Sequence, residues 1–73
     1  MEMKITQKQY EEFLKEFAWQ RLKSPDYRLG QAFCNHFSRQ VNIILGTVEE
    51  FRLYYAHDDE YANMLIERCV ERE

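Results

Sequence analysis

Two stretches of the chain contain the side chains that metal sites and nucleophilic catalysis require. The run His57-Asp58-Asp59-Glu60 combines an imidazole with three carboxylates, and Cys34 precedes His36 by two positions. Metal ligands must converge on one point, whereas four successive residues at a helix start point in different directions. Residues i and i+2 of a helix do not face each other, so Cys34 and His36 do not form a nucleophile–base pair. We therefore interpret the run as a helix cap and His36 as a core histidine.

The sequence carries no wider signature of catalysis or cofactor binding. Its 73 residues contain no G-x-S-x-G elbow, no P-loop and no dinucleotide-binding fingerprint. A chain of this length also leaves little room for a pocket of roughly 300 Å³, the lower end of the range for small-molecule sites. The sequence therefore predicts one non-enzymatic domain over residues 1–73, with no cofactor and no metal.

Aromatic residues are the second source of candidate functional side chains. Five Phe, five Tyr and one Trp make up 15% of the chain, which is more than so small a core can hide. Tyr and Trp favour interfaces because they combine an apolar body with a polar group. Trp19 lies nearly opposite Tyr10 on a helical projection, so it either packs under a loop or a neighbouring helix or faces a partner. We predict that Trp19, Tyr54 and Tyr55 are aromatic anchors for a partner protein.

The net charge of −3 is divided unevenly along the chain. Residues 1–39 carry seven positive and five negative side chains, whereas residues 40–73 carry three positive and eight negative ones. An acidic C-terminal half disfavours non-specific binding to nucleic acid and suits a basic partner. Solvation of exposed helix faces produces the same pattern and stays open as the alternative.

Capping signals and apolar periodicity predict a first helix at the N-terminal end. Thr6 and Gln9 have the spacing of a capping box, and Ser24-Pro25-Asp26 ends the helix. The apolar stripe of this helix comprises Tyr10, Phe13, Leu14, Phe17 and Ala18.

A second helix is expected to begin near Tyr27, with Asp26 as its N-cap. Gly30 lies inside it although glycine costs about 1 kcal/mol relative to alanine, so we expect a close approach of another helix or a partner there. Val41–Leu45 is interpreted as the end of this helix or a short buried extension. The inward residues are Leu29, Phe33, His36 and Phe37, and the polar face comprises Arg28, Gln31, Asn35, Ser38, Arg39 and Asn42.

Two shorter helices are expected to complete the fold. Gly46 is the predicted C-terminal stop and Thr47 the N-cap of the next helix, and Asp58 or Asp59 caps the last one. The apolar side of the third helix comprises Val48, Phe51, Tyr54 and Tyr55, and that of the last helix Tyr61, Ala62, Leu65, Ile66 and Cys69, with Arg68 and Arg72 at its C-terminal end. The sequence thus predicts a compact all-α domain of three or four helices, with self-association, for example as a homodimer.

The two cysteines and the absence of long apolar runs indicate the compartment. Cys34 and Cys69 are too few for a secreted disulfide scaffold, so both are expected to be buried or half-buried thiols in a reducing cytosol. The N-terminus lacks the apolar stretch of a signal peptide, and no run approaches the roughly 20 residues of a membrane span. We expect a soluble, cytoplasmic protein.

Binding to DNA through the second helix is the alternative function. Gln31 and Asn35 can read adenine from the major groove, and the turn at 24–26 is compatible with a helix-turn-helix. Against this, the isoelectric point is near 5.4. The basic residues around this helix are Arg21, Lys23, Arg28 and Arg39.

One motif resembles a group of short bacteriophage and prophage proteins that have no assigned activity. The motif is Arg28-x-Gly30-Gln31-Ala32-Phe33-Cys34-Asn35-x-Phe37, followed by Leu53-Tyr54-Tyr55, Asp58-Asp59, Ala62 and Ile66. The resemblance covers roughly residues 27–69 and implies a phage gene product in the cytoplasm of a bacterial host. Small acidic phage proteins often bind and block or redirect host proteins.

The favoured prediction is therefore a non-enzymatic phage-type protein that binds and modulates a host or phage protein. Besides the aromatic anchors, Arg28, Gln31, Asn35 and Arg39 are predicted to form a polar contact face. A small DNA-binding regulator and a virion or assembly accessory protein remain as alternatives.

Overall fold

The chain folds into one long helix followed by four short ones. The structure is a computed structural model, and residues 4–71 of it are described here. The helices are α1 (Gln7–Lys23), α2 (Leu29–His36), α3 (Ser38–Leu45), α4 (Thr47–Tyr54) and α5 (Asp59–Glu67). The predicted all-α class is confirmed, but the described residues form five helices instead of three or four. Arg72, which was expected at the end of the last helix, lies outside them.

Helix α1 begins where the capping box predicts. The Thr6 hydroxyl accepts a hydrogen bond from the Gln9 amide at 3.1 Å, and the Gln9 side chain accepts one from the Thr6 amide at 3.0 Å. Phe13 and Phe17 are buried, whereas Leu14 and Ala18 are exposed although both were expected in the apolar stripe. The difference arises because α2 is the one described helix whose backbone approaches α1, so α1 buries a narrow strip.

Helix α2 begins later than predicted because a turn precedes it. The Tyr27 amide donates to the Ser24 carbonyl at 2.9 Å, which places Pro25 and Asp26 at the tip of the turn. Asp26 is therefore exposed and does not cap the helix. Arg28 takes the N-cap position instead, without a side-chain hydrogen bond.

The additional helix arises from a break at Phe37, which separates α2 from α3. Phe37 leaves the helical conformation, with φ −121° and ψ 38°, and its buried ring packs 5.0 Å from the Phe33 ring and 5.7 Å from the Phe13 ring. Val41 in α3 is buried, but Ile43 is exposed, so only part of the predicted extension is buried.

Gly46 ends α3 and precedes α4, as predicted for the break at this position. Its φ of +85° lies in the left-handed region, where glycine has no steric cost. The prediction of Thr47 as an N-cap is wrong, because Gly46 holds that position and Thr47 is the first residue of α4. By contrast, Asp58 caps α5 as one of the two predicted residues, accepting from the Glu60 amide at 3.0 Å.

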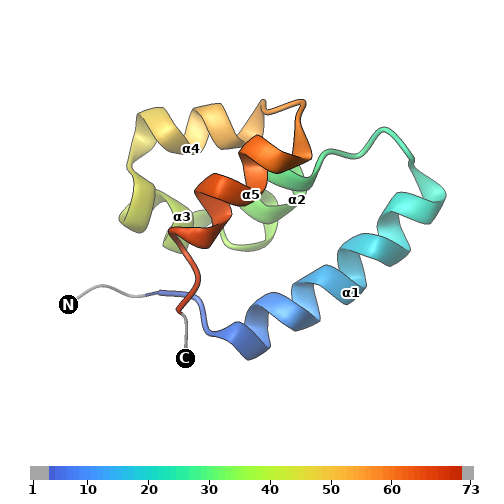
Figure 1. The fold of residues 1–73 in the computed structure, drawn as a ribbon, viewed down its shortest axis with the longest axis horizontal. Helices are drawn as coiled ribbons and strands as arrows, with labels where there is room; N and C mark the ends of the chain where they lie inside the picture. The colour runs from blue at the N-terminus through green and yellow to red at the C-terminus, as the bar shows by residue number, and fades with distance from the viewer. Residues whose placement is uncertain (1–3, 72–73) are drawn as a thin grey trace.

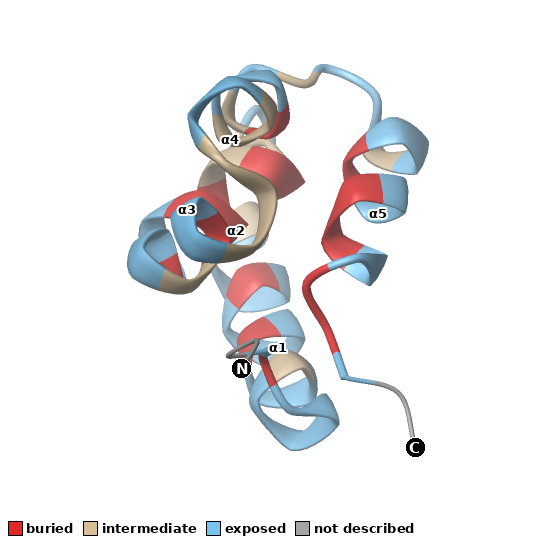
Figure 2. Ribbon diagram, turned by 90° about the vertical axis from the view of Figure 1, so that its left-hand side faces the viewer, coloured by how far each residue is buried: buried red, intermediate tan, exposed pale blue. Residues whose placement is uncertain are grey.

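Helix α2 is the centre of the molecule and packs against the other four helices. It lies between α4 and α1 (Figure 1 and Figure 2), and the buried side of α5 faces it. Gly30 of α2 meets α4 so closely that an added Cβ atom would lie 2.0 Å from the Leu53 carbonyl oxygen. The close approach expected at Gly30 is therefore internal to the fold. The most fully buried side chains are Phe33, Ile5, Leu53, Ile66, Val41 and Cys69.

The two ends of the described chain are joined by a short parallel bridge. The Ile5 amide donates to the Cys69 carbonyl at 2.9 Å, and the Glu71 amide donates to the Ile5 carbonyl at 2.7 Å. Cys69 and Cys34 are both buried and unbonded to each other, as the sequence predicted. None of the helices in residues 4–71 has the length and apolar character that crossing a membrane requires.

Candidate functional site

Helix α4 presents an apolar face to solvent. Leu53 is its buried residue, and it lies directly against Gly30. Phe51 and Tyr55 lie two positions from Leu53 and Val48 lies five positions from it, so they are rotated by roughly 200° and 140° about the helix axis and point away from the core. Val48, Phe51 and Tyr55 are accordingly 65%, 63% and 51% exposed. The apolar side predicted for this helix therefore faces solvent at these three residues, which we call the α4 surface.

Polar contacts on the flanks of α4 fix this orientation. Arg68, the C-cap residue of α5, forms an ion pair with Glu49, and the Asn42 side-chain amide of α3 donates to Glu50 at 2.9 Å. Both glutamates are thereby held at the edge of the helix that touches its neighbours, half-buried and partnered. Leu53, Glu49 and Glu50 therefore hold α4 against its neighbours. The residues of the α4 surface take no part in these contacts.

Aromatic rings are clustered along the α4 surface. The Phe51 and Tyr55 ring centroids are 4.6 Å apart, and those of Tyr54 and Tyr55 are 4.9 Å apart. Tyr54 is half-buried at the edge, and its hydroxyl accepts a hydrogen bond from the Gln31 amide at 3.4 Å. An open hollow of about 270 Å³ lies among these rings, Thr47 and Glu50.

The segment that contains α4 and the start of α5 is mainly acidic. Residues 47–60 contain five carboxylates and one basic residue, Arg52. Two of the carboxylates are neutralised by arginines from other helices, because Arg68 pairs with Glu49 and Arg21 donates to Asp59 at 2.9 Å. Among the described residues, no ion pair to Lys or Arg is found for the other three, which are Glu50, Asp58 and Glu60.

The predicted contact residues do not form one face. Tyr54, Tyr55 and Gln31 lie together at the α4 surface, while Arg28 is half-buried at the start of α2 and its Nε atom is buried without a hydrogen-bond partner in the described residues. The other two, Asn35 and Arg39, are exposed on α2 and α3. Because α2 contacts four helices and the Gln31 side-chain amide donates to the Tyr54 hydroxyl, this placement weighs against α2 as a helix that enters a DNA groove.

Trp19 lies on another side of the molecule. It is 64% exposed on α1, so the prediction that it packs under a loop or a neighbouring helix is wrong. The alternative that it faces a partner remains. The ammonium group of Lys23 lies 5.9 Å from the centre of its indole ring.

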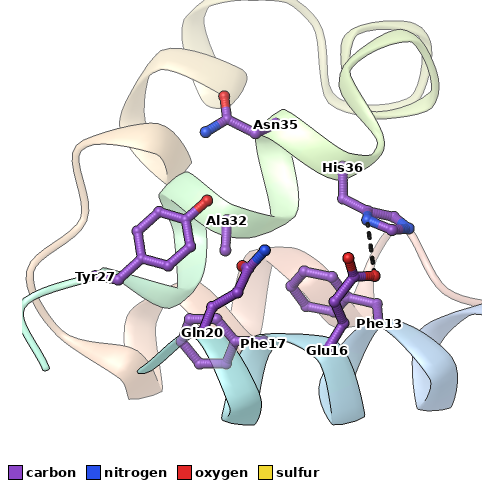
Figure 3. A pocket seen from close by; sticks show the side chains of 8 residues that line it. All are labelled: Phe13, Glu16, Phe17, Gln20, Tyr27, Ala32, Asn35 and His36. Carbon is purple, nitrogen blue, oxygen red and sulfur yellow. Dashed lines mark ion pairs between the residues drawn. The ribbon is translucent and has the colours of Figure 1, made fainter. Parts of the chain in front are cut away.

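His36 lines a narrow cleft between α1 and α2 (Figure 3). Its side chain is 43% exposed, so the prediction of a core histidine is wrong. The Nδ1 atom lies 4.0 Å from a Glu16 carboxylate oxygen, while the Asn35 side chain points away from this pair. The cleft measures about 160 Å³, roughly half the smallest volume typical of small-molecule sites. In residues 4–71, no three His, Cys, Asp or Glu side chains are grouped as metal ligands would be.

Sequence reasoning missed Val48 and Phe51 as site residues because it assigned them only to the apolar side of a helix. The signal that identifies them is indirect: a helical glycine at position 30 demands a close neighbour, and Leu53 supplies it. Comparison of the chain with protein-family models, with curated proteins and with solved structures found no match.

Proposed function

We propose that this chain is a non-enzymatic protein-binding module that modulates its partner by docking through the α4 surface. The observation that supports this is the exposure of Val48, Phe51 and Tyr55 along one side of a helix whose packing is complete without them. Contiguous exposed apolar surface marks interaction sites, and clustered aromatic residues supply most of the binding energy at such sites.

The charges near α4 favour a basic partner. Glu50 lines the hollow among the aromatic rings, and Asp58 and Glu60 follow α4 in the sequence, so these carboxylates favour a surface with lysine or arginine residues around an apolar centre. In the phage setting that the sequence motif implies, the partner is a host or phage protein in the bacterial cytoplasm. Modulation follows when docking covers a surface that the partner uses for its own activity.

A comparative capture experiment tests the proposal. The tagged chain, a Phe51→Ala variant and a Met64→Ala variant are incubated with nuclease-treated bacterial lysate, and the bound proteins are quantified by mass spectrometry. Met64 lies on α5 and is 55% exposed, so its variant removes a similar exposed apolar side chain outside the α4 surface. The captured protein is then purified, and its affinity for the three chains is measured.

We expect Phe51→Ala to weaken binding at least about tenfold, as for a central aromatic contact, and Met64→Ala to leave it unchanged. Binding should weaken only moderately as salt rises, because apolar contacts dominate it. Equal binding of all three chains would refute the proposal. Loss of all captured protein on nuclease treatment, or a steep power-law dependence on salt, would favour the DNA-binding alternative instead.

A further inference from the structure

The cleft between α1 and α2 has an acidic end and an aromatic wall. Glu16 lies at one end of it, and Gln20 and Tyr27 lie toward the other (Figure 3). The rings of Phe13 and Phe17 also line it. Among the described residues, its lining contains this one carboxylate and no lysine or arginine. The cleft therefore carries a negative charge and no permanent positive charge.

The Glu16 carboxylate is available to a ligand. Its side chain is 57% exposed, and within residues 4–71 it forms no ion pair with a lysine or an arginine. The Nδ1 atom of His36 lies 4.0 Å from one carboxylate oxygen, which is longer than a hydrogen bond. The Gln20 and Tyr27 side chains also form no hydrogen bond within this part of the chain. The cleft thus combines a carboxylate with two polar side chains whose hydrogen-bonding capacity is left for a ligand.

A neighbouring contact indicates which ligand chemistry suits these rings. Outside the cleft, the Arg21 Cζ atom lies 5.0 Å from the centre of the Phe17 ring, and Arg21 Nη1 donates to Asp59 at 2.9 Å. An aromatic face and a carboxylate together hold that guanidinium group. The cleft offers the same two elements, with Glu16 as the carboxylate and Phe13 as a ring, and no lysine or arginine of the described residues lines it.

The volume of the cleft suits the end of a side chain. It measures about 160 Å³, and a cavity of about 150 Å³ is large enough to hold benzene. A guanidinium group with its attached methylenes has a similar number of heavy atoms. A second hollow of about 320 Å³ adjoins the cleft, because Gln20 and Tyr27 line both, and it leaves room for the remainder of a bound residue.

We propose that this cleft binds an arginine side chain of a partner protein, with the guanidinium group donating to Glu16 and stacking on the aromatic wall. Arginine fits better than lysine because its planar guanidinium group stacks on rings and donates two hydrogen bonds to one carboxylate, whereas an ammonium group is compact and strongly hydrated. This goes beyond the proposed function, because α2 lies between the cleft and α4 and the described lining includes no residue of α4 (Figure 1).

NMR titration of the isotope-labelled chain with three related probes tests the proposal. The probes are the acetylated amides of arginine, lysine and citrulline, and citrulline replaces the charged guanidinium group by a neutral urea of the same shape. They are added to the unmodified protein and to Glu16→Gln and Glu11→Gln variants at a slightly alkaline pH, where histidine side chains are mostly neutral. Glu11 is the matched control, because it is exposed and lies five positions, or roughly 140° around the helix, from Glu16.

We expect the arginine probe to shift the amide signals of the cleft residues in a saturable manner, with a dissociation constant of roughly 1–10 mM. Replacing arginine by citrulline, or Glu16 by Gln, should each weaken binding at least about tenfold, because either change removes a charge-assisted hydrogen bond. The lysine probe should bind more weakly than the arginine probe. The Glu11→Gln variant should bind arginine within about twofold of the unmodified protein, because solvent and salt screen the distant charge.

Other outcomes would overturn the proposal. These are the absence of saturable shifts at the cleft up to roughly 50 mM probe, equal binding of citrulline and arginine, equal effects of Glu16→Gln and Glu11→Gln, or lysine binding as tight as that of arginine. Dispersed amide signals establish that each variant is folded. Phe51→Ala should bind the arginine probe as the unmodified protein does, so failure at the cleft and failure of docking through the α4 surface are separate results.

Discussion

Replacing Gly30 with alanine separates packing from helix propensity, because the two effects have opposite signs. At an unobstructed helical position, glycine to alanine stabilises a helix by about 1 kcal/mol. At Gly30 the new Cβ atom would lie 2.0 Å from the Leu53 carbonyl oxygen, 3.0 Å from its carbonyl carbon and 3.1 Å from its Cδ1 atom. A carbon–oxygen contact needs roughly 3.3 Å, so α4 must withdraw by more than about 1 Å.

The size of the destabilisation by Gly30→Ala depends on which neighbouring atoms can move. The closest obstacle is a backbone oxygen, which a change of side-chain rotamer cannot relieve. We therefore take the upper part of the range for overpacked cores, about 2–3 kcal/mol, and subtract the propensity gain. Gly30→Ala should destabilise the protein by about 1–2 kcal/mol, which lowers the melting temperature by roughly 4–16 °C in a domain of this size.

Urea and thermal unfolding followed by circular dichroism measure this change. Gly46→Ala is the control, because the structure leaves open space around that position but holds it at φ +85°. Its expected cost of about 1–3 kcal/mol comes from the backbone conformation alone, because φ +85° with ψ 167° is essentially restricted to glycine. A Gly30→Ala protein as stable as the original, or more stable, would refute the close packing of α2 against α4 and with it the assignment of Leu53 as the inward residue.

Three further predictions concern stability and pH. Burial raises the pKa of the Cys34 thiol to about 12 and that of Cys69 to about 11, from 9.0, so the folded state holds protons that the unfolded chain loses. This stabilisation is complete below pH 9 and is lost as pH rises toward 11–12, and urea unfolding across that interval should show a steeper decline than in a double Cys→Ala variant. Phe51→Ala should change the free energy of unfolding by less than about 0.5 kcal/mol, as at other exposed sites. Leu53→Ala should lower it by about 2–5 kcal/mol. Equal losses in the two variants would contradict the orientation of α4. Thr6→Ala should cost about 1 kcal/mol by removing the α1 cap, measured by thermal unfolding.

Local signals in the sequence predicted local structure well. The capping box at Thr6 and the cap at Asp58 depend on residues within a few positions of each other, and both are present in the structure. The Asp26 cap failed for an equally local reason, because the turn that Pro25 forms places Asp26 at its tip. Such competition between two plausible local structures cannot be decided from residue preferences alone.

The orientation of α4 could not be predicted from its own residues. Apolar periodicity predicts that the side of α4 with more apolar residues, which contains Phe51, faces the core and not the side with Leu53. It also predicts that the glutamates face solvent. The structure reverses this order because Gly30 accepts Leu53 closely and because Glu49 finds Arg68 on another helix. Both contacts are tertiary, so a reading of one helix at a time could not find the exposed face.

The residues that hold α4 in place differ from those that it exposes to solvent, so the exposed face can be tested by mutation. The contacts that hold the helix run through Leu53, Glu49 and Glu50, and the α4 surface shares none of these three residues. Substitutions at Phe51 or Tyr55 therefore change what the helix presents to another molecule without changing how it is held. A loss of binding or assembly in those variants can be attributed to the surface itself, whereas the same loss in Leu53→Ala would report unfolding. An aromatic face of this kind adds little to the stability of the fold that carries it, and this supports the proposed docking role.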